Sequence, residues 1–286
     1  MESAFTDWLK ESPRSNTDKS AIKVFRKAYP NRPAEQVDNG SIAIAMAGNA
    51  PGTYNRTLAI IRAALNLAAS RKLITVAPKL KNKKTPAGIV RYLTVEQYKA
   101  LRAELPAHLL APFEFSLATG QRRSNVLQLR WDQVDLKRKF LRLDASVMKS
   151  GEHHGIPLGE EAMAILRAAR EVSLALAPAE RSEFVFLYRG APIKSPKTAW
   201  DAARVRAKLP KFRWHDLRHT WASWMAMSGA PLTAVKEGGA WASMDMVARY
   251  SHLSPKHLAA YADGAIKALR EDETVTFSDT VKGKKR

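Results

Sequence analysis

The feature that most constrains this chain is a break in its helical pattern at residues 77–90. The segment lacks an apolar repeat and is rich in residues that interrupt helices or favour solvent: Pro78, Lys79, Lys81, Lys83, Lys84, Pro86 and Gly88. We therefore expect two domains joined by an exposed basic linker at residues 81–90. Such a linker is either merely solvated or follows a phosphate backbone, and the two interpretations are compatible.

Residues before the break favour a small helical domain over residues 1–80. The clearest helix is predicted from about Tyr54 to Arg71, with Thr53 as its N-cap. Its apolar residues recur at intervals of three and four, which is typical of an amphipathic helix: Leu58, Ile61, Leu65 and Ala68.

Residues after the break predict a second domain over residues 91–270, followed by a basic tail at 271–286. Thr94 and Gln97 form a candidate capping box at a helix start. A β-like stretch at residues 140–143 turns and returns at 156–158, which predicts an antiparallel hairpin with Lys149 at or near its tip. The fold class is therefore mainly α (α+β), with a helical N-terminal domain and a mixed helical domain that holds a small antiparallel sheet.

The charge of the chain narrows its partners. Its 286 residues hold 47 Lys and Arg against 27 Asp and Glu, a formal net charge of +20 with a pI near 10.2. Such a field attracts nucleic acid or an anionic membrane. Since no apolar run reaches the roughly 18 residues of a membrane span, nucleic acid is the better partner, and the alternative is a soluble basic protein without that function.

The absence of cysteine from the sequence excludes disulfides, thiolate metal sites and cysteine nucleophiles. It also fits a reducing compartment. The first residues, Met1 to Phe5, have no basic stretch followed by an apolar one, so no signal peptide is expected. We expect a cytoplasmic protein associated with the nucleoid.

Three separated segments carry residues suited to phosphodiester chemistry: 118–124, 215–219 and 241–253. Cleaving a phosphodiester without a metal requires side chains that stabilise the developing negative charge, supply a nucleophile and move protons. Arginine suits the first task because its planar fork binds two phosphate oxygens and keeps its charge. Taken singly, each such residue is more often structural than catalytic.

Four residues of these segments fit named roles. Arg122 and Arg218 can bind the non-bridging phosphate oxygens. His215, three residues before Arg218, lies on the same predicted helical face and can take or share a proton. Tyr250 is the candidate nucleophile, and it needs such help because the ordinary pKa of a phenol is about 10.

Together these motifs resemble those of the tyrosine recombinase family, which includes phage integrases and Xer recombinases. The matching residues are Ala118-Thr119-Gly120 followed by Arg122, His215 with Leu217-Arg218-His219, and Trp241 nine residues before Tyr250. The resemblance covers residues 93–260, and residues 53–74 also resemble the family's core-binding domain.

The resemblance implies a site-specific recombinase that cleaves and rejoins DNA through a 3′-phosphotyrosyl bond at Tyr250, without cofactor, ATP or metal. Lys149 would donate a proton to the departing 5′ oxygen, with Lys137 and Lys139 as nearby alternatives. Trp241 would stand where many members have histidine, and His219 would support the site. Arg122 is favoured over Arg123 because it follows Gly120 by two residues. The expected DNA contacts are Arg56, Arg62, Lys81, Lys83 and Lys84.

The resemblance also implies partners. The expected substrate is double-stranded DNA with paired recombination sites, bound by a homotetramer of a chain that is monomeric when free. A helix around residues 253–269 would dock on the neighbouring protomer, and accessory directionality or DNA-bending factors are further candidates. Integration and excision of a phage or genomic island is favoured over chromosome-dimer resolution. Since no separate arm-binding domain is expected before residue 5, we expect either a two-domain recombinase or an integrase whose extra domain is missing or very short.

One departure from the family pattern keeps alternatives open. Asn125 stands where the family usually has an acidic residue, three positions after the first arginine. A type IB topoisomerase would share the phosphotyrosine chemistry but relax supercoils as a monomer. A non-catalytic DNA-binding protein on the same fold would bind DNA and form no covalent bond.

Overall fold

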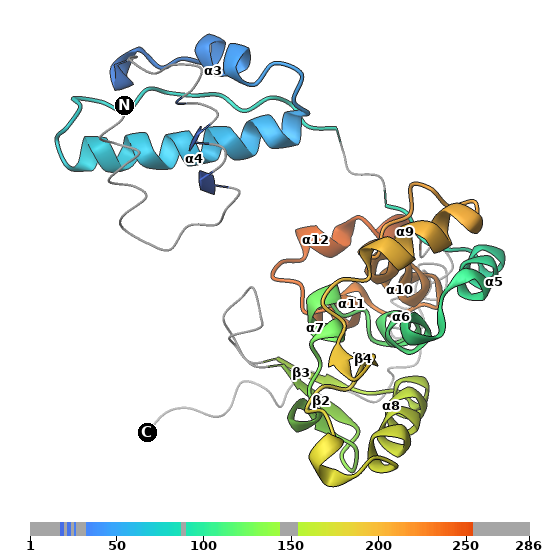
Figure 1. Ribbon diagram of the computed structural model, residues 1–286. Helices are drawn as coiled ribbons and strands as arrows, with labels where there is room; N and C mark the ends of the chain where they lie inside the picture. Colours follow the sequence, from blue (N-terminus) through green and yellow to red (C-terminus); the bar gives the residue numbers. More distant parts are fainter. Residues whose placement is uncertain are drawn as a thin grey trace, which may run out of the picture. The chain divides into compact units, whose positions relative to one another are not determined.

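A computed structural model describes residues 18–19, 22–23, 26, 33–86, 90–143 and 154–253. The chain divides into two compact units, residues 1–88 and 89–286, each with its own hydrophobic core (Figure 1). Lys149, at the tip of the predicted hairpin, and the helix predicted around residues 253–269 lie outside the described residues, apart from Leu253.

The first unit is built around one long helix, α4 (Pro51–Ser70), with α3 (Asn39–Ala45) and the 3-10 turn η1 (Ala34–Gln36) beside it in sequence. The predicted apolar stripe is confirmed, since its four residues are 0–1% exposed. The N-cap prediction is wrong. The helix begins at Pro51, after Ala50, because proline has a fixed φ and no N–H to leave unpaired at the first helical position. Thr53 therefore lies inside the first turn.

The basic segment after this helix is exposed from residue 81 to 86, as predicted, but it is tied to its own unit. Asn39 accepts from the Lys81 amide at 2.9 Å and donates to the Lys81 carbonyl at 2.7 Å. Asn55 makes the same pair of bonds with Lys83, both at 2.8 Å. Two side-chain amides thus hold the backbone of a segment that the sequence alone predicts to be a free linker.

The second unit is mainly helical. Its helices are α5 (Val95–Glu104), α6 (Ala107–Thr119), α7 (Arg123–Leu127), α8 (Glu160–Leu174), α9 (Lys197–Arg206), α10 (Asp216–Met227), α11 (Leu232–Gly238) and α12 (Asp245–Ala248). Short 3-10 turns occur at Trp131–Gln133 (η2), Pro178–Glu180 (η4) and Ser251–Leu253 (η5). The capping box predicted for Thr94 and Gln97 is confirmed at the start of α5.

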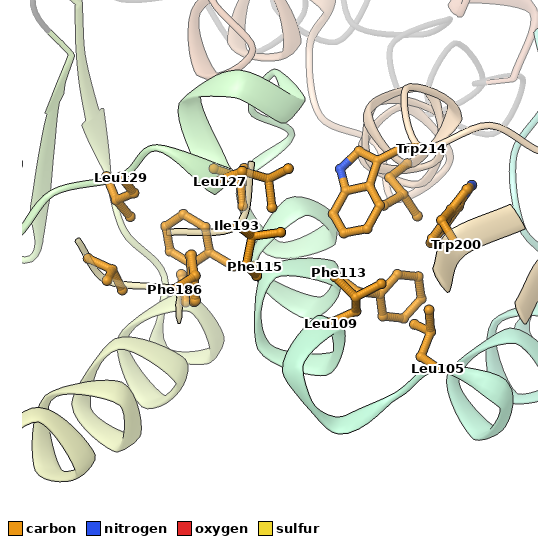
Figure 2. Close-up of a cluster of buried hydrophobic side chains, with 14 of the residues drawn as sticks. Leu105, Leu109, Phe113, Phe115, Leu127, Leu129, Phe186, Ile193, Trp200 and Trp214 are labelled. Atoms are coloured by element: carbon orange, nitrogen blue, oxygen red, sulfur yellow. The ribbon is translucent and has the colours of Figure 1, made fainter. Parts of the chain in front are cut away.

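The helix α6 is the centre of this unit, because it packs against both α8 and α10. Its Phe113 lies against Trp200 of α9, with ring centroids 6.2 Å apart, and Trp214 packs on Trp200 at 4.8 Å (Figure 2). This aromatic cluster fixes the segment that leads into α10. No helix in the described part of the chain is long and apolar enough to cross a membrane.

Two small antiparallel sheets complete the unit. β1 (Val134–Asp135), β2 (Phe140–Leu143) and β3 (His154–Pro157) pair in the order β1-β2-β3, and β4 (Leu187–Tyr188) pairs with β5 (Ala191–Pro192). The predicted return strand is confirmed by the pairing of Leu141 with Ile156. The mixed helical fold with a small antiparallel sheet is therefore as the sequence predicts.

Candidate active site

The start of α10 places three of the candidate residues. His215 is the N-cap residue, and Arg218 and His219 follow in the first turn. The turn is anchored by Asp216, which is fully buried and accepts from the Arg213 backbone amide at 2.8 Å and from its guanidinium at 2.7 Å. This bond raises the pKa of Arg213 above its ordinary value. The ion pair holds the direction in which α10 begins.

Arg218 is a buried cation without a carboxylate partner among the described residues. Its side chain is 3% exposed, donates to the Gly120 carbonyl at 2.9 Å, and stacks its guanidinium carbon 3.8 Å from the Trp241 ring centroid. Burial, and then the positive charge of Arg122, lower the pKa of Arg218, but a guanidinium stays charged at neutral pH. No carboxylate among the described residues lies within ion-pair distance of it, so its charge is available to an anion.

Arg122 reaches the same place from the turn after α6. Gly120 ends that helix in the left-handed region, with a φ of 64°, and a Cβ there would lie 2.3 Å from the Trp221 ring. The turn leaves Arg122 half-buried as the N-cap of α7, where its guanidinium donates to the Ala240 carbonyl at 3.4 Å. Arg123 is exposed and lines a different pocket.

A tight loop between α11 and α12 carries Trp241, which the sequence already placed among the candidate residues. A Cβ on Gly239 would lie 1.9 Å from the Trp241 ring, so only glycine allows the ring to fold back here. Gln121 donates to the Thr119 carbonyl at 3.1 Å and the Gly238 carbonyl at 3.0 Å, and so joins this loop to the Arg122 turn. Trp221 stacks on Trp241 at 6.0 Å. The glycine pair before Trp241 was the available signal for this tight loop.

Tyr250 is completely buried in this conformation. Its hydroxyl hydrogen-bonds to His219 Nδ1 at 2.5 Å, and its ring lies 6.1 Å from that of Trp241. Burial raises the pKa of Tyr250 to about 12, opposed by the positive charges of Arg249 and Arg218. Burial and then His215 lower the pKa of His219 to about 4. A neutral His219 can therefore accept the phenol proton in this hydrogen bond.

The two histidines differ in position. His215 is exposed, and its ring stands edge-on to that of His219 at 5.3 Å. Partial burial, and then the charges of Arg218 and Arg213, lower the pKa of His215 below its ordinary value. The sequence interpretation gives the tyrosine proton to His215, whereas the structure pairs the Tyr250 hydroxyl with His219. His215 instead faces solvent beside the two arginines.

The remaining predicted residues lie elsewhere. Asn125 is buried on α7, 6% exposed, and accepts from the Ser124 hydroxyl at 3.4 Å. Lys139, one of the alternatives to Lys149, forms an ion pair with Glu160, and Lys137 is exposed on the turn before β2.

The residues of the first unit that are expected to contact DNA make the following contacts within that unit. Arg56 forms an ion pair with Asp18 at 2.9 Å. Arg62 donates to the Leu80 carbonyl at 2.8 Å, so its guanidinium supports the basic segment itself. Lys83 lies 4.2 Å from the centre of the Tyr54 ring. The other two residues, Lys81 and Lys84, are exposed.

The chemical capacity of the site follows from this geometry. Segments about a hundred residues apart in sequence bring Arg122 and Arg218 together, with Trp241, Tyr250 and His219 beside them. Among the described residues no carboxylate pairs with either cation, so both can bind the oxygens of one phosphate group. A phenol lies behind them, held by a neutral imidazole. The arrangement can therefore bind a phosphodiester and deliver an oxygen nucleophile to it.

The sequence of this chain is similar to the sequences of several known proteins. Residues 91–257 match the model of the phage integrase family. The integrase of Salmonella phage P22 is 35% identical over 72% of this chain and 55% of its own length. Tyrosine recombinase XerC of Thermodesulfovibrio yellowstonii is 25% identical over 87% of each chain. The chain spans about half the length of the first curated relatives that it matches.

A solved structure supports the fold. The structure of lambda integrase (75–356), a dimer bound to a COC′ core site, covers 88% of this chain and 95% of its own, with a TM-score of 0.67 and 18% identity. At that identity the likeness concerns the fold alone.

Proposed function

Since this chain belongs to the phage integrase family, we propose that it is a site-specific tyrosine recombinase that cleaves and rejoins DNA strands through a 3′-phosphotyrosyl intermediate. The observation that carries the proposal is the meeting of Arg122, Arg218 and Tyr250 from three distant segments around one loop that holds Trp241. Residues 1–80 would be the core-binding domain, 81–90 the linker and 91–270 the catalytic domain.

The arginines act on the phosphate. Arg122 and Arg218 would each donate to non-bridging oxygens of the scissile phosphate and stabilise the charge that grows as phosphorus becomes five-coordinate. Because Arg218 is 3% exposed and already fixed by the Gly120 carbonyl, little reorganisation is needed when the phosphate binds. The Trp241 ring supports the guanidinium from its other face.

The tyrosine must first be released. A hydroxyl that is buried, with its pKa raised to about 12, is a poor nucleophile. We therefore assign this conformation to a resting state, in which His219 holds the phenol. In the reaction the Tyr250 oxygen bonds to phosphorus, its proton passes to His215 at the open edge of the site, and the bond from phosphorus to the 5′ oxygen breaks.

The cycle closes without loss of bond energy. Lys149 would give its proton to the departing 5′ oxygen, an assignment that rests on the family resemblance. The 5′-hydroxyl of the partner duplex then attacks the phosphotyrosyl phosphorus and gives its proton to the now neutral Lys149, while the phenolate leaves and recovers its proton from His215. Two strands exchange partners while the number of phosphodiester bonds is conserved, so the reaction itself consumes no ATP.

The assembly is also a proposal. Four protomers would bring together two double-stranded DNA sites, because strand exchange takes place between two duplexes. Accessory factors would set the direction of recombination. Integration and excision of a mobile element at the nucleoid is the favoured role.

The deciding experiment traps the covalent intermediate. The full chain is incubated with a pool of duplexes of varied sequence, each nicked beside a candidate cleavage position so that the short product diffuses away. We expect a covalent protein–DNA complex on denaturing gels that Tyr250→Phe abolishes and EDTA leaves unchanged. Tyr188→Phe, at an exposed tyrosine on β4, is the matched control and should keep the adduct.

The outcomes separate the rival activities. An adduct that persists in Tyr250→Phe contradicts the assignment of the nucleophile. DNA binding by the wild type without any adduct would indicate a non-catalytic DNA-binding protein. An adduct accompanied by relaxation of supercoils, but by no transfer between two duplexes, would indicate a topoisomerase of type IB.

A further inference from the structure

A second cationic cavity lies next in sequence to the active-site residues but uses none of them. It has a volume of about 340 Å³ and is lined by one side of α9 with the preceding Pro196, by Arg123, and by four residues between α9 and α10: Pro210, Lys211, Arg213 and Trp214. Arg123 directly follows Arg122, and Trp214 directly precedes His215. The cavity and the active site are therefore built on the same two turns of the chain.

The cavity carries an excess of positive charge. Five of its lining residues are cationic: Arg123, Lys197, Arg204, Lys211 and Arg213. Its one lining carboxylate, Asp201, binds Lys197 and Arg204, both at 2.8 Å, and the buried Asp216 binds Arg213 at 2.7 Å. In the described part of the chain no carboxylate pairs with Arg123 or Lys211. Five cations against two carboxylates leave a site that favours an anion.

Two buried indole groups lack hydrogen-bond partners at this cavity. Trp200 and Trp214, which line it, are 4% and 5% exposed, and within the described residues neither Nε1–H has an acceptor. Figure 2 shows the nitrogen of each ring at the end away from Phe113. Both nitrogens are shielded from solvent, so the two indoles form part of the cavity wall beside any bound anion and are not its ligands.

The start of α9 adds a second source of attraction. Pro196 and Lys197 line the cavity, and the ten-residue helix has no side-chain N-cap. The Lys197 amide bonds to the Ser195 hydroxyl at 3.3 Å. The other N–H groups of the first turn and the positive end of the helix dipole together favour a phosphate or a similar anion.

We propose that this cavity binds a phosphate group, and that in function this is the DNA backbone phosphate adjacent to the one that is cleaved. The assignment to DNA rests on the proposed function. Each strand of a duplex presents a phosphate about every 3.4 Å along the helix axis, so a strand whose scissile phosphate lies on Arg122 and Arg218 offers its next phosphate to a neighbouring cavity. Arg123 and Lys211 are then positioning residues, which hold the strand in register. The other possible source is free phosphate.

The first test follows the two indoles in the intact chain labelled with ¹⁵N-tryptophan. Seven tryptophans give seven indole N–H signals, and Trp200→Phe and Trp214→Phe assign the two of interest. Inorganic phosphate, and at lower concentration duplex DNA, should shift both signals. Arg123→Ala/Lys211→Ala, which alters exposed side chains only, should lose the shifts. Lys194→Ala removes one positive charge from an exposed lysine outside the cavity and should retain the shifts.

The second test removes single charges from the DNA. In nicked substrates that form the covalent adduct, a methylphosphonate replaces one backbone phosphate at a time. Neutralising the phosphate beside the cleaved one should slow adduct formation by the wild type and by Lys194→Ala about tenfold, the factor expected from one lost charge-assisted contact. In Arg123→Ala/Lys211→Ala the same replacement should change the rate less than about twofold, because the contact is already absent.

The outcomes distinguish this inference from the proposed function. If no substrate gives an adduct, the recombinase proposal fails, and the indole titration with phosphate still judges the cavity. If adducts form but neither phosphate nor DNA shifts the indoles, the cavity is not a phosphate site. If phosphate shifts them while the methylphosphonate effects are equal in wild type and double variant, the assignment to DNA is overturned.

Discussion

The two halves of the candidate active site differ in how far they are arranged for the proposed reaction. The arginine half, formed by the turn after α6 and the start of α10, is assembled: Arg218 is fixed by a carbonyl and a ring face, and no carboxylate in the described part of the chain pairs with it. The tyrosine half, residues 239–253, holds its hydroxyl buried against His219. The electrostatic part of the chemistry thus belongs to the rigid scaffold, whereas the nucleophile has to be delivered.

The difference has a physical reason. Preorganised cations accelerate a reaction because no energy is spent in orienting them when charge develops. A permanently exposed and activated nucleophile would attack any phosphodiester that reached the arginines. Keeping the phenol protonated and buried allows the protein to bind DNA before it can cleave it. The following substitutions test this contrast between preorganised arginines and a buried tyrosine.

The largest effect is expected from Arg218→Lys in the arginine half. A lysine keeps the charge but cannot donate to two oxygens or stack flat on Trp241. We expect the rate of adduct formation to fall by about 10²–10³-fold, the range for loss of one preorganised donor. DNA affinity in a gel-shift assay should change far less. Arg167→Lys, on the exposed face of α8, is the control, and an equal loss in it would contradict the assignment.

The next effect tests the turn that assembles the arginine half. Gly120→Ala places a Cβ 2.3 Å from the Trp221 ring at a φ of 64°, so strain and overlap add. We expect the free energy of unfolding to fall by about 2–4 kcal/mol. Gly190→Ala is matched in backbone strain, with a φ of 76° and open space around its Cβ, and should cost only about 1 kcal/mol. Chemical denaturation measures both, and equal costs would show that the packing on Trp221 is unimportant.

The smallest effect concerns the tyrosine half and its pH dependence. The pKa of His219 falls from 6.5 to about 4 on folding, so the unfolded chain binds the proton more tightly. Its contribution to stability is full above pH 6.5 and is lost as the pH falls toward 4. After allowance for partial exposure, we expect this loss to be about 1–2 kcal/mol. His219→Gln should flatten the unfolding free energy across that window, while His252→Gln, at an exposed histidine, should not.

A slope across that window that is the same in His219→Gln and in the wild type would show that the imidazole is not held neutral by the fold. A neutral His219 would then not be what holds the tyrosine half in its resting state, and the burial of the Tyr250 hydroxyl would need another explanation.

Much of the arginine half could be predicted from the sequence. Local patterns are enough to place Arg122 after a glycine that ends a helix, and His215 and Arg218 on one helical turn, because these depend on residues a few positions apart. The capping box at Thr94 and the β2–β3 hairpin belong to the same class of local signal. Only the start of α4 was misplaced, since Pro51 outweighs Thr53 as a start signal.

The tyrosine half could not be predicted in the same detail. The bond between Tyr250 and His219 joins residues 31 positions apart, and the Gln121 bond to Gly238 spans 117. Such contacts depend on how helices pack and which rotamers remain, which no periodicity encodes. The sequence predicts candidate residues for the site, but which histidine touches the phenol is a property of the packed structure.

The tied basic segment has a consequence for encounters with DNA. A flexible run of lysines would lose conformational freedom on meeting a polyanion, and that loss would weaken its grip. Here Asn39 and Asn55 hold the main chain at alternate residues, Lys81 and Lys83, so the ordering of the backbone is completed when the domain folds. Only the lysine side chains lose conformational freedom when an anion binds, so the segment presents its positive charges on an already ordered backbone.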